Sequence, residues 1–383
     1  MLITDTSELI TFCEALADAP YIAVDTEFLR EKTYAAQLCL VQIAHGEHAA
    51  AIDPLSPVLD LAPLHALLAN PKTVKVLHAA SQDLEIFLQT MGEVPAPVFD
   101  TQIAAAVCGH GEQPGYATLV DNMLGLHIDK VSQSTDWSLR PLSERQLEYA
   151  IGDVTHLCKI YELLVEQLES QGRNQWIEGE MASLLNPARY RVDPNEAWRR
   201  IKIRRPKREA LAVLRELAAW RERTAIRRNL PRSWVIGDEA LIEIAQHAPR
   251  SAEQLSRVRG LKSNIARGRD GEALLSAVKT ALDSPEESWP PLPPKRVPLS
   301  GHESLVALLQ ALLRLRGETH GVAPRLIANR ADLDRIATED DPDVPALSGW
   351  RRELFGADAL ALRAGRLALT GSEGGVADVR LDE

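Results

Sequence analysis

Residues 21–28 read YIAVDTEF, an apolar run that ends in two acids placed two positions apart. A short apolar run of this kind predicts a buried strand. Side chains at positions i and i+2 of a strand point to the same face, so Asp25 and Glu27 are expected side by side. Neighbouring carboxylates repel each other unless a cation lies between them. The stretch therefore predicts a central strand that ends in a cation site, with solvated acids at a strand end as the alternative.

The residues that follow continue the same sheet. Short connections between the early runs favour hairpin pairing, and the later alternation of strands and helices favours a mixed sheet flanked by helices. This order of strands and helices predicts an α/β domain. Strands are expected at Gln37–Ala44, Ala49–Ile52, Val74–Leu77 and Val98–Phe99, and helices at Leu61–Ala69, Ser81–Thr90 and Thr101–Cys108.

Further polar residues stand near the ends of these elements. Asp83 follows the Val74–Leu77 run, where it is either a ligand or an acid in the first turn of a helix. Tyr149 and Asp153 are four residues apart on a predicted helix, so they share one face beside its apolar stripe. A half-buried acid needs a partner, which is either a cation or the Tyr149 hydroxyl. His78, at a strand end, is either structural or catalytic.

Together, the four acids and the phenol favour a site for hard cations. Carboxylate oxygens are the ligands that Mg²⁺ and Mn²⁺ prefer. Two such ions ~3.5–4 Å apart can stabilise both the attacking and the leaving oxygen of a phosphoryl transfer. The sequence has no Gly-rich Walker loop, so a nucleotide cofactor is not expected.

Beyond residue 115 the strand signals stop and helical patterns take over. A long helix is expected over Ser143–Leu168, with Ser143 and Gln146 as its capping box. The residues Pro231, Asp238, Leu241 and Ala245 are echoed, with a gap, by Pro324, Asn329, Leu333 and Ala337, which indicates a duplicated helical domain. We expect an α/β domain at 1–190, a connector at 191–206, a helical domain at 207–284, a Pro-rich linker at 285–300, a degenerate second helical domain at 301–371 and a flexible tail at 372–383.

The charge of the chain is unevenly distributed. The 383 residues carry a net charge of −11, yet Arg199–Arg232 contains 13 Lys and Arg against 3 Glu. This segment is either a solvated helix face or a surface that follows phosphates. Trp198 and Trp234 could stack on bases, whereas Trp220 falls on the apolar stripe and is expected in the core. The chain lacks an apolar run long enough for a membrane helix and a basic leader, and its four cysteines are widely spaced, which favours a cytoplasmic protein with reduced thiols.

The candidate residues lie within longer stretches that carry a family resemblance. These are AVDTEF (23–28), QLCLVQIA (37–44), VLHAASQDLEIF (76–87), VFDTQIAAAVCG (98–109) and DWSLRPLSERQLEYAIGDVTHL (136–157). They keep their order and resemble the ribonuclease D family, of the tyrosine subgroup of DEDD 3′–5′ exonucleases. IRRNLPRSWVIGDEALIEIA (226–245) resembles an HRDC domain, and residues 300–371 resemble a weaker second copy that is acidic around Asp332–Asp343.

The resemblance implies a ribonuclease H-like exonuclease domain followed by two HRDC-type helical bundles. Asp25, Glu27 and Asp153 would hold the ion that activates water, and Asp25, with Asp83 acting through water, would hold the ion at the leaving 3′ oxygen. Tyr149 would orient the water or help to deprotonate it. The nucleic-acid contacts expected beside these residues are Phe28, His78, Arg204, Arg205, Arg227 and Arg228.

The implied activity is a 3′–5′ exoribonuclease that uses Mg²⁺ or Mn²⁺ and releases nucleoside 5′-monophosphates. The resemblance suggests RNA with a free 3′ end as the partner, in particular tRNA precursors, and no membrane. A DNA-directed exonuclease of the same fold and a non-enzymatic RNA-binding scaffold are the alternatives. Association between chains stays open, with a monomer favoured.

Overall fold

The computed structural model describes residues 1–128, 135–261, 263–292 and 301–381. The chain forms two compact units. The first unit comprises Met1–Glu27, Leu40–Asn186 and Arg296–Glu383, and the second comprises Phe28–Cys39 and Pro187–Lys295. Within the described residues, no helix has the length and apolar character that crossing a membrane requires.

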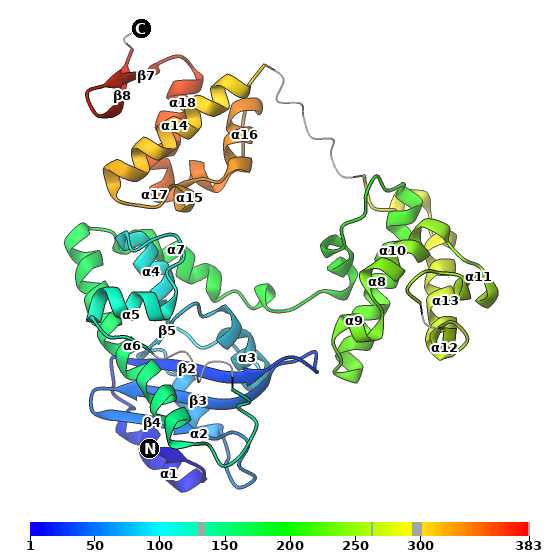
Figure 1. Cartoon of the computed structure of the whole chain (residues 1–383), viewed down its shortest axis with the longest axis horizontal. Helices are drawn as coiled ribbons and strands as arrows, with labels where there is room; N and C mark the ends of the chain where they lie inside the picture. The colour runs from blue at the N-terminus through cyan, green and yellow to red at the C-terminus, as the bar shows by residue number, and fades with distance from the viewer. Residues whose placement is uncertain (129–134, 262, 293–300, 382–383) are drawn as a thin grey trace. The chain divides into compact units, whose positions relative to one another are not determined.

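A six-stranded mixed sheet forms the centre of the N-terminal α/β domain (Figure 1). Its order is β1-β4-β3-β2-β5-β6, so β2 lies in the interior of the sheet, as the apolar run before Asp25 predicts. β3 and β4 form the expected antiparallel hairpin, whereas β1 pairs with β4, and β5 with β2 and β6, in parallel. The strands are β1 (Leu2–Ile3), β2 (Tyr21–Leu29), β3 (Gln37–His45), β4 (His48–Ile52), β5 (Val74–Leu77) and β6 (Val98–Asp100).

Helices cover this sheet, and the longest of them matters most for the site. α6 (Glu144–Gln171) packs against β4, β5 and α4, and it begins with the predicted capping box of Ser143 and Gln146. Gly172 ends it at φ 65°, the left-handed conformation that favours glycine. The other helices of this domain are α1 (Thr6–Ala15), α2 (Ala62–Ala69), α3 (Ser81–Met91), α4 (Thr101–Cys108), α5 (Tyr116–Leu124) and α7 (Asn174–Leu184).

The second unit is a helical bundle around α8 (Arg208–Arg228). Asn229 ends α8 at φ 48°, and Leu230 and Pro231 follow it. Residues 263–283 form two helices, Ser263–Ala266 and Arg269–Asp283, and the chain between them turns so closely that a Cβ at Gly271 would lie 2.3 Å from the Ala266 carbonyl oxygen. The remaining elements are η2 (Pro187–Arg189), η3 (Pro194–Arg200), α9 (Arg232–Val235), α10 (Asp238–His247), α11 (Ala252–Ser256), α12 (Ser263–Ala266), α13 (Arg269–Asp283) and η4 (Glu286–Ser288).

The expected Pro-rich linker is only partly described. Its first residues belong to the second unit, because Trp289 packs against the bundle core and Arg208 donates to the carbonyl oxygens of Glu286 and Trp289. The rest of the linker, residues 293–300, lies outside the described residues.

A second helical bundle follows within the first unit and repeats the order of the first. A long helix, α14, precedes a one-turn helix, α15, and a shorter helix, α16, just as α8 precedes α9 and α10. Leu333 and Ala337 are buried like Leu241 and Ala245, which supports the predicted duplication. The elements are α14 (Glu303–His320), α15 (Pro324–Ile327), α16 (Arg330–Thr338), η5 (Pro345–Leu347), α17 (Gly349–Arg351), the π-helix η6 (Arg352–Gly356) and α18 (Ala357–Arg363).

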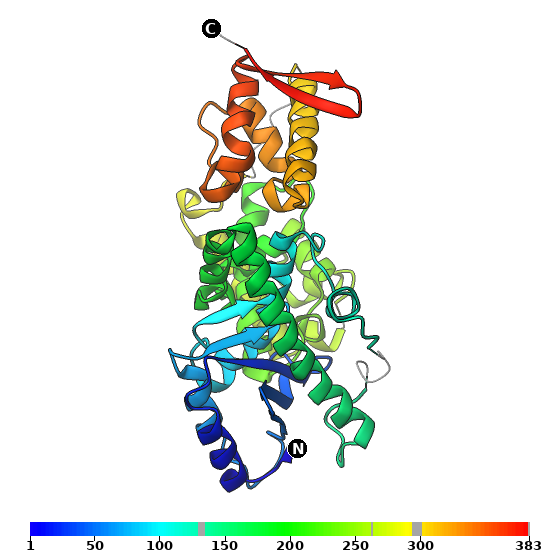
Figure 2. The ribbon, with the colours of Figure 1, turned by 90° about the vertical axis from the view of Figure 1, so that its left-hand side faces the viewer.

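The expectation of a flexible tail from residue 372 is wrong for the part that the structure describes. β7 (Leu367–Ser372) and β8 (Gly375–Arg380) form an antiparallel hairpin beside α14 (Figure 2). Leu367 is buried in the bundle core, and Asp378 accepts hydrogen bonds from Arg316 of α14. These two anchors order a segment whose glycines and acids resemble those of a frayed tail.

Candidate active site

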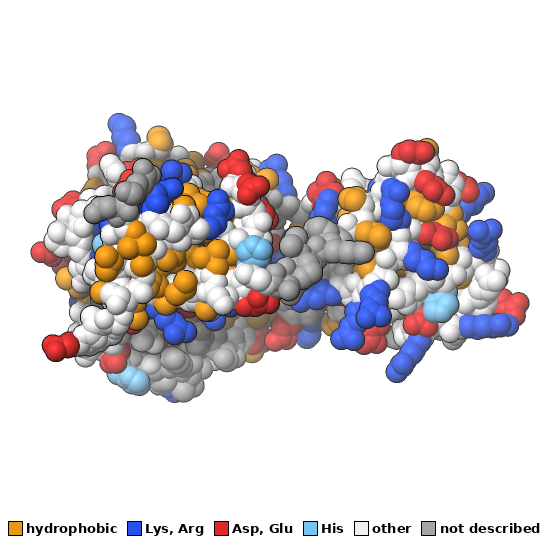
Figure 3. All heavy atoms as spheres, turned by 90° about the horizontal axis from the view of Figure 1, so that it is seen from above, with side chains coloured by type: hydrophobic (Ala, Val, Ile, Leu, Met, Phe, Trp, Pro, Cys, Tyr) orange, Lys and Arg blue, Asp and Glu red, His pale blue; other side chains and the backbone are white. Residues whose placement is uncertain are grey.

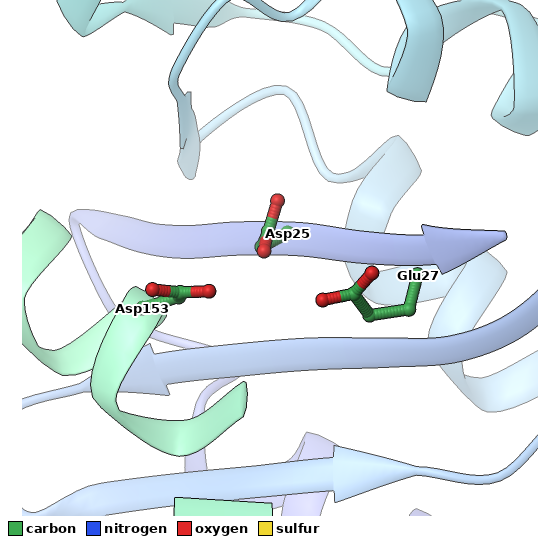
Figure 4. A group of neighbouring side chains, drawn as sticks. All are labelled: Asp25, Glu27 and Asp153. Atoms are coloured by element: carbon green, nitrogen blue, oxygen red, sulfur yellow. The ribbon is translucent and has the colours of Figure 1, made fainter. Parts of the chain in front are cut away.

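Three of the predicted acids meet where β2 faces α6. Asp25 and Glu27 share one face of β2, and α6 brings in Asp153. One carboxylate oxygen from each lies within 4.8 Å of the others. Figure 4 shows the carboxylates of Glu27 and Asp153 turned toward each other, with Asp25 between them. The structure therefore brings together residues 128 positions apart in the chain, in the arrangement expected of a cation site.

Local sequence determines how Asp153 reaches this point. Ala150, Val154 and Leu157 are buried and form the stripe by which α6 contacts the sheet. Asp153 follows the same stripe and is itself buried, with 7% of its surface exposed. Burial of the apolar face of α6 therefore places Asp153 inside the protein.

Burial and mutual repulsion oppose ionisation of the three acids. Burial, followed by repulsion from Asp153, raises the pKa of Glu27 to about 8. Burial raises the pKa of Asp153 to about 7, against a hydrogen bond from Tyr149 that lowers it. The pKa of Asp25 is raised well above its usual range by burial and then by the surrounding acids. Among the described residues no Lys or Arg forms an ion pair with these acids, so the oxygen donors fit divalent cations supplied from outside the chain.

Asp83 lies beside this cluster but is not one of the three converging acids. It is buried at the start of α3 and accepts a hydrogen bond from the Thr26 hydroxyl on the neighbouring strand. Burial raises its pKa to about 7, and its charge raises the pKa of both Asp25 and Glu27. The site thus contains all four predicted acids, three in direct proximity and one held by Thr26.

Two tyrosines border the acids. The Tyr149 side chain lies beside the Asp153 carboxylate, and burial, followed by the charge of Asp153, raises the pKa of Tyr149. Tyr116 donates to the backbone carbonyl oxygen of Asp153, and its pKa is raised by the same causes. Sequence reasoning missed Tyr116, because neither its spacing nor its neighbours mark it as part of the site.

The two residues expected to contact the terminal nucleotide differ in their surroundings. Phe28 follows Glu27 on β2 and is half-exposed. His78 is engaged within the protein: its Nδ1 lies 3.0 Å from the Thr101 hydroxyl, and its ring lies 5.3 Å from the ring of Tyr116. His78 is therefore placed to support Tyr116, whereas Phe28 keeps part of its surface exposed.

The basic segment divides into exposed and engaged side chains. Arg204, Arg205 and Arg227 are exposed. Arg228 is also exposed, but it forms two hydrogen bonds with Asp270, of 2.6 and 2.8 Å. On the face drawn in Figure 3, the Lys and Arg side chains of this bundle (right) are interspersed with acidic ones. As expected, Trp220 packs against the core, while Trp234 is 59% exposed.

Comparison with protein families defines the class of this fold and site. A 3′–5′ exonuclease family model matches residues 1–169, and an HRDC domain model matches residues 210–278. The α/β domain with its converging carboxylates is therefore a 3′–5′ exonuclease domain, and the bundle around α8 is an HRDC domain.

Full-length relatives identify the family. Ribonuclease D of Granulibacter bethesdensis is 49% identical, over 96% of this chain and 93% of that protein, and ribonuclease D of Acidiphilium cryptum is 49% identical over 96% and 94%. The crystal structure of Escherichia coli RNase D, described as an exoribonuclease involved in structured RNA processing, superposes with a TM-score of 0.82 at 35% identity, covering 95% of this chain and 98% of that one. The catalytic core of Trypanosoma brucei RRP6 shares the fold, with a TM-score of 0.56 at 23% identity over 73% and 79%. This chain belongs to the ribonuclease D family, and it is a 3′–5′ exoribonuclease.

Proposed function

We propose that this enzyme shortens RNA from a free 3′ end, one nucleoside 5′-monophosphate at a time, with two divalent cations at the acid cluster, and that its substrates include tRNA precursors. The observation that carries the proposal is the meeting of Asp25, Glu27 and Asp153 within 4.8 Å, with no basic partner among the described residues. Two bound Mg²⁺ or Mn²⁺ ions would supply the charge that stabilises the attacking and leaving oxygens.

Each of the four acids has a distinct part in this proposal. Asp25, Glu27 and Asp153 would hold one ion, and Asp25, with Asp83 acting through water, would hold the other. The hydrogen bond between Thr26 and Asp83 fixes the orientation of the fourth carboxylate, as partners of metal ligands generally do.

Tyr149 orients the attacking water in this proposal. Its raised pKa keeps the phenol protonated near neutral pH, so the hydroxyl can donate to one acceptor and receive a hydrogen bond from water. Tyr116, bound to the Asp153 carbonyl oxygen, holds the helix turn that carries both Tyr149 and Asp153.

The exposed cations of the HRDC bundle are proposed to contact the body of the RNA. Arg204, Arg205 and Arg227 remain candidates because they are exposed, whereas Arg228 is committed to Asp270. Phosphate contacts of this kind give affinity without sequence preference and weaken as salt rises.

The test is a 3′-end digestion assay with wild type, Asp25→Asn and the control Asp121→Asn. Asp121 is an exposed acid on α5, so its replacement removes the same charge away from the cluster. A tRNA precursor with a 3′ extension, a matched unstructured RNA and a matched DNA strand serve as substrates, each with Mg²⁺, Mn²⁺ or EDTA. We expect mononucleotide release from RNA by wild type and Asp121→Asn, and its loss with EDTA or in Asp25→Asn. Faster digestion of the DNA strand would favour the DNA-directed alternative.

A further inference from the structure

An ion pair outside the acid set ties the loop before α6 to the sheet. Arg140 lies in this loop, and its guanidinium holds the carboxylate of Asp53 at the end of β4, with Nε–Oδ2 at 2.6 Å and Nη2–Oδ1 at 2.7 Å. The Asp53 side chain is 7% exposed and that of Arg140 is 26% exposed. A half-buried, two-point contact of this kind fixes the guanidinium plane in a way that a lysine cannot.

The same guanidinium also forms hydrogen bonds with the backbone at Trp137. Its third nitrogen, Nη1, donates to the carbonyl oxygens of Trp137, at 2.7 Å, and Leu139, at 2.8 Å. Trp137 is 2% exposed, and its indole N–H finds no acceptor among the described residues. The position of the indole therefore depends on this backbone anchor and on packing.

The indole contacts the tyrosine of the proposed site. The rings of Trp137 and Tyr149 have centroids 6.3 Å apart and planes inclined by 36°. Trp137 thus packs beside the ring of Tyr149, and the hydroxyl of Tyr149 lies near Asp153.

Thr135, in the described part of this loop, is also held in place. Gln146, which completes the capping box of α6, donates from Nε2 to the Thr135 hydroxyl at 3.2 Å. Asp53 lies 87 residues before Arg140, so the loop and the first turns of α6 are held both by the helix cap and by a distant strand end. This pairing orients Trp137 relative to the sheet that carries Asp25 and Glu27.

We propose that the Asp53–Arg140 ion pair is a positioning device for Tyr149, which acts through Trp137 and sets where the phenol holds the attacking water. The inference rests on the proposed role of Tyr149. A displacement of ~1 Å at a group that orients a reactant can cost about 100-fold in rate. The pair therefore affects the catalytic step while Asp53 and Arg140 themselves contact no substrate.

The experiment is a double-mutant cycle on mononucleotide release from unstructured RNA. Arg140→Lys keeps the positive charge but loses the two-point contact, and we expect it to lower kcat by about 10-fold with KM nearly unchanged. In the Tyr149→Phe background, Arg140→Lys should lower kcat by less than about 2-fold, because the group being positioned has already lost its hydroxyl. Trp137→Leu, which removes the indole, should reproduce both results.

Controls separate positioning from loss of fold. Arg316→Lys weakens an ion-pair cluster in the C-terminal bundle and should leave kcat unchanged. Thermal unfolding of each variant shows whether it folds; if Arg140→Lys does not, Asp53→Glu and Trp137→Phe carry the test. An equal fall of kcat in both backgrounds, or no fall in either, would overturn the inference. A Tyr149→Phe variant as active as wild type would instead overturn the proposed role of Tyr149.

Discussion

Two acidic clusters in this protein contain similar residues and have opposite electrostatics. In the exonuclease domain, Asp25, Glu27 and Asp153 face one another without a basic partner among the described residues, and their pKa values are raised. In the C-terminal bundle, Arg316 lies between Asp358 and Asp378, at 2.6 and 2.8 Å, and the pKa of Asp378 is lowered.

The difference shows how to distinguish a structural cluster from a functional one. The C-terminal acids receive their cation from the chain, so their charge stabilises the fold as it stands. The exonuclease acids oppose the metal-free fold and become favourable only when cations arrive from outside. Strongly shifted pKa values without an internal partner are typical of sites that bind or react.

Neutralising one acid in each cluster should therefore affect different properties: activity in the exonuclease cluster and stability in the C-terminal cluster. The largest expected effect is the one on activity. Asp153→Asn removes a proposed ligand and the partner of Tyr149, so we expect mononucleotide release to fall by about 1,000-fold or more. Asp378→Asn should leave release unchanged and lower the thermal midpoint. Initial rates and calorimetry on the same preparations check both. Comparable rates in wild type and Asp153→Asn would contradict the prediction.

The pH dependence of stability should follow the exonuclease cluster. The pKa values of Glu27, Asp83 and Asp153 are raised to about 8, 7 and 7, above their unfolded values. These groups therefore stabilise the metal-free fold fully below about pH 4, and that contribution is lost as the pH rises through 7 to 8. We expect the metal-free midpoint to fall by about 5–10 °C between pH 5 and pH 8.5.

Divalent cations and Asp153→Asn should each reduce this fall, since both remove the repulsion. Asp121→Asn provides the charge-matched control and should keep the full pH dependence. A metal-free midpoint that rises across this range would show that the cluster is already neutralised by the chain.

Removing the internal cation should make the C-terminal cluster resemble the catalytic one. Arg316→Leu leaves Asp358 and Asp378 without their shared partner. These carboxylates can still reach solvent, so we expect a loss of about 1–2 kcal/mol in the free energy of unfolding. Urea unfolding measures it. Because the hairpin β7–β8 depends on this contact, its amides should also exchange hydrogen faster, and unchanged exchange would argue against the anchor.

Local signals in the sequence predicted much of this fold. Val74–Leu77 and Thr101–Cys108 were predicted to the residue, and the capping box of α6 was predicted from two residues three apart. The pairs Asp25–Glu27 and Tyr149–Asp153 were predicted because period-2 and period-4 spacings place side chains on one face, and their assignment to one site came from the combined set of acids and the family resemblance. Signals that depend on distant partners were missed: the hairpin anchored by Arg316, and the contact between Asp53 and Arg140, which no local pattern marks.

The distinction between acids with and without a partner in the chain applies to basic side chains too. The smallest expected effect is on RNA binding by two arginines. Arg227 and Arg228 are neighbours at the end of α8, but Arg227 is exposed and Arg228 is bound to Asp270. Arg227→Gln should weaken RNA binding by a few-fold and reduce the slope of log affinity against log salt by about 0.7, the value for one phosphate contact on a single strand. Arg228→Gln should leave that slope unchanged and lower stability slightly, because its charge is already used by Asp270. Filter binding at several salt concentrations checks the pair, and equal slopes for the two variants would mean that a side chain's partner in the free protein does not determine its availability to RNA.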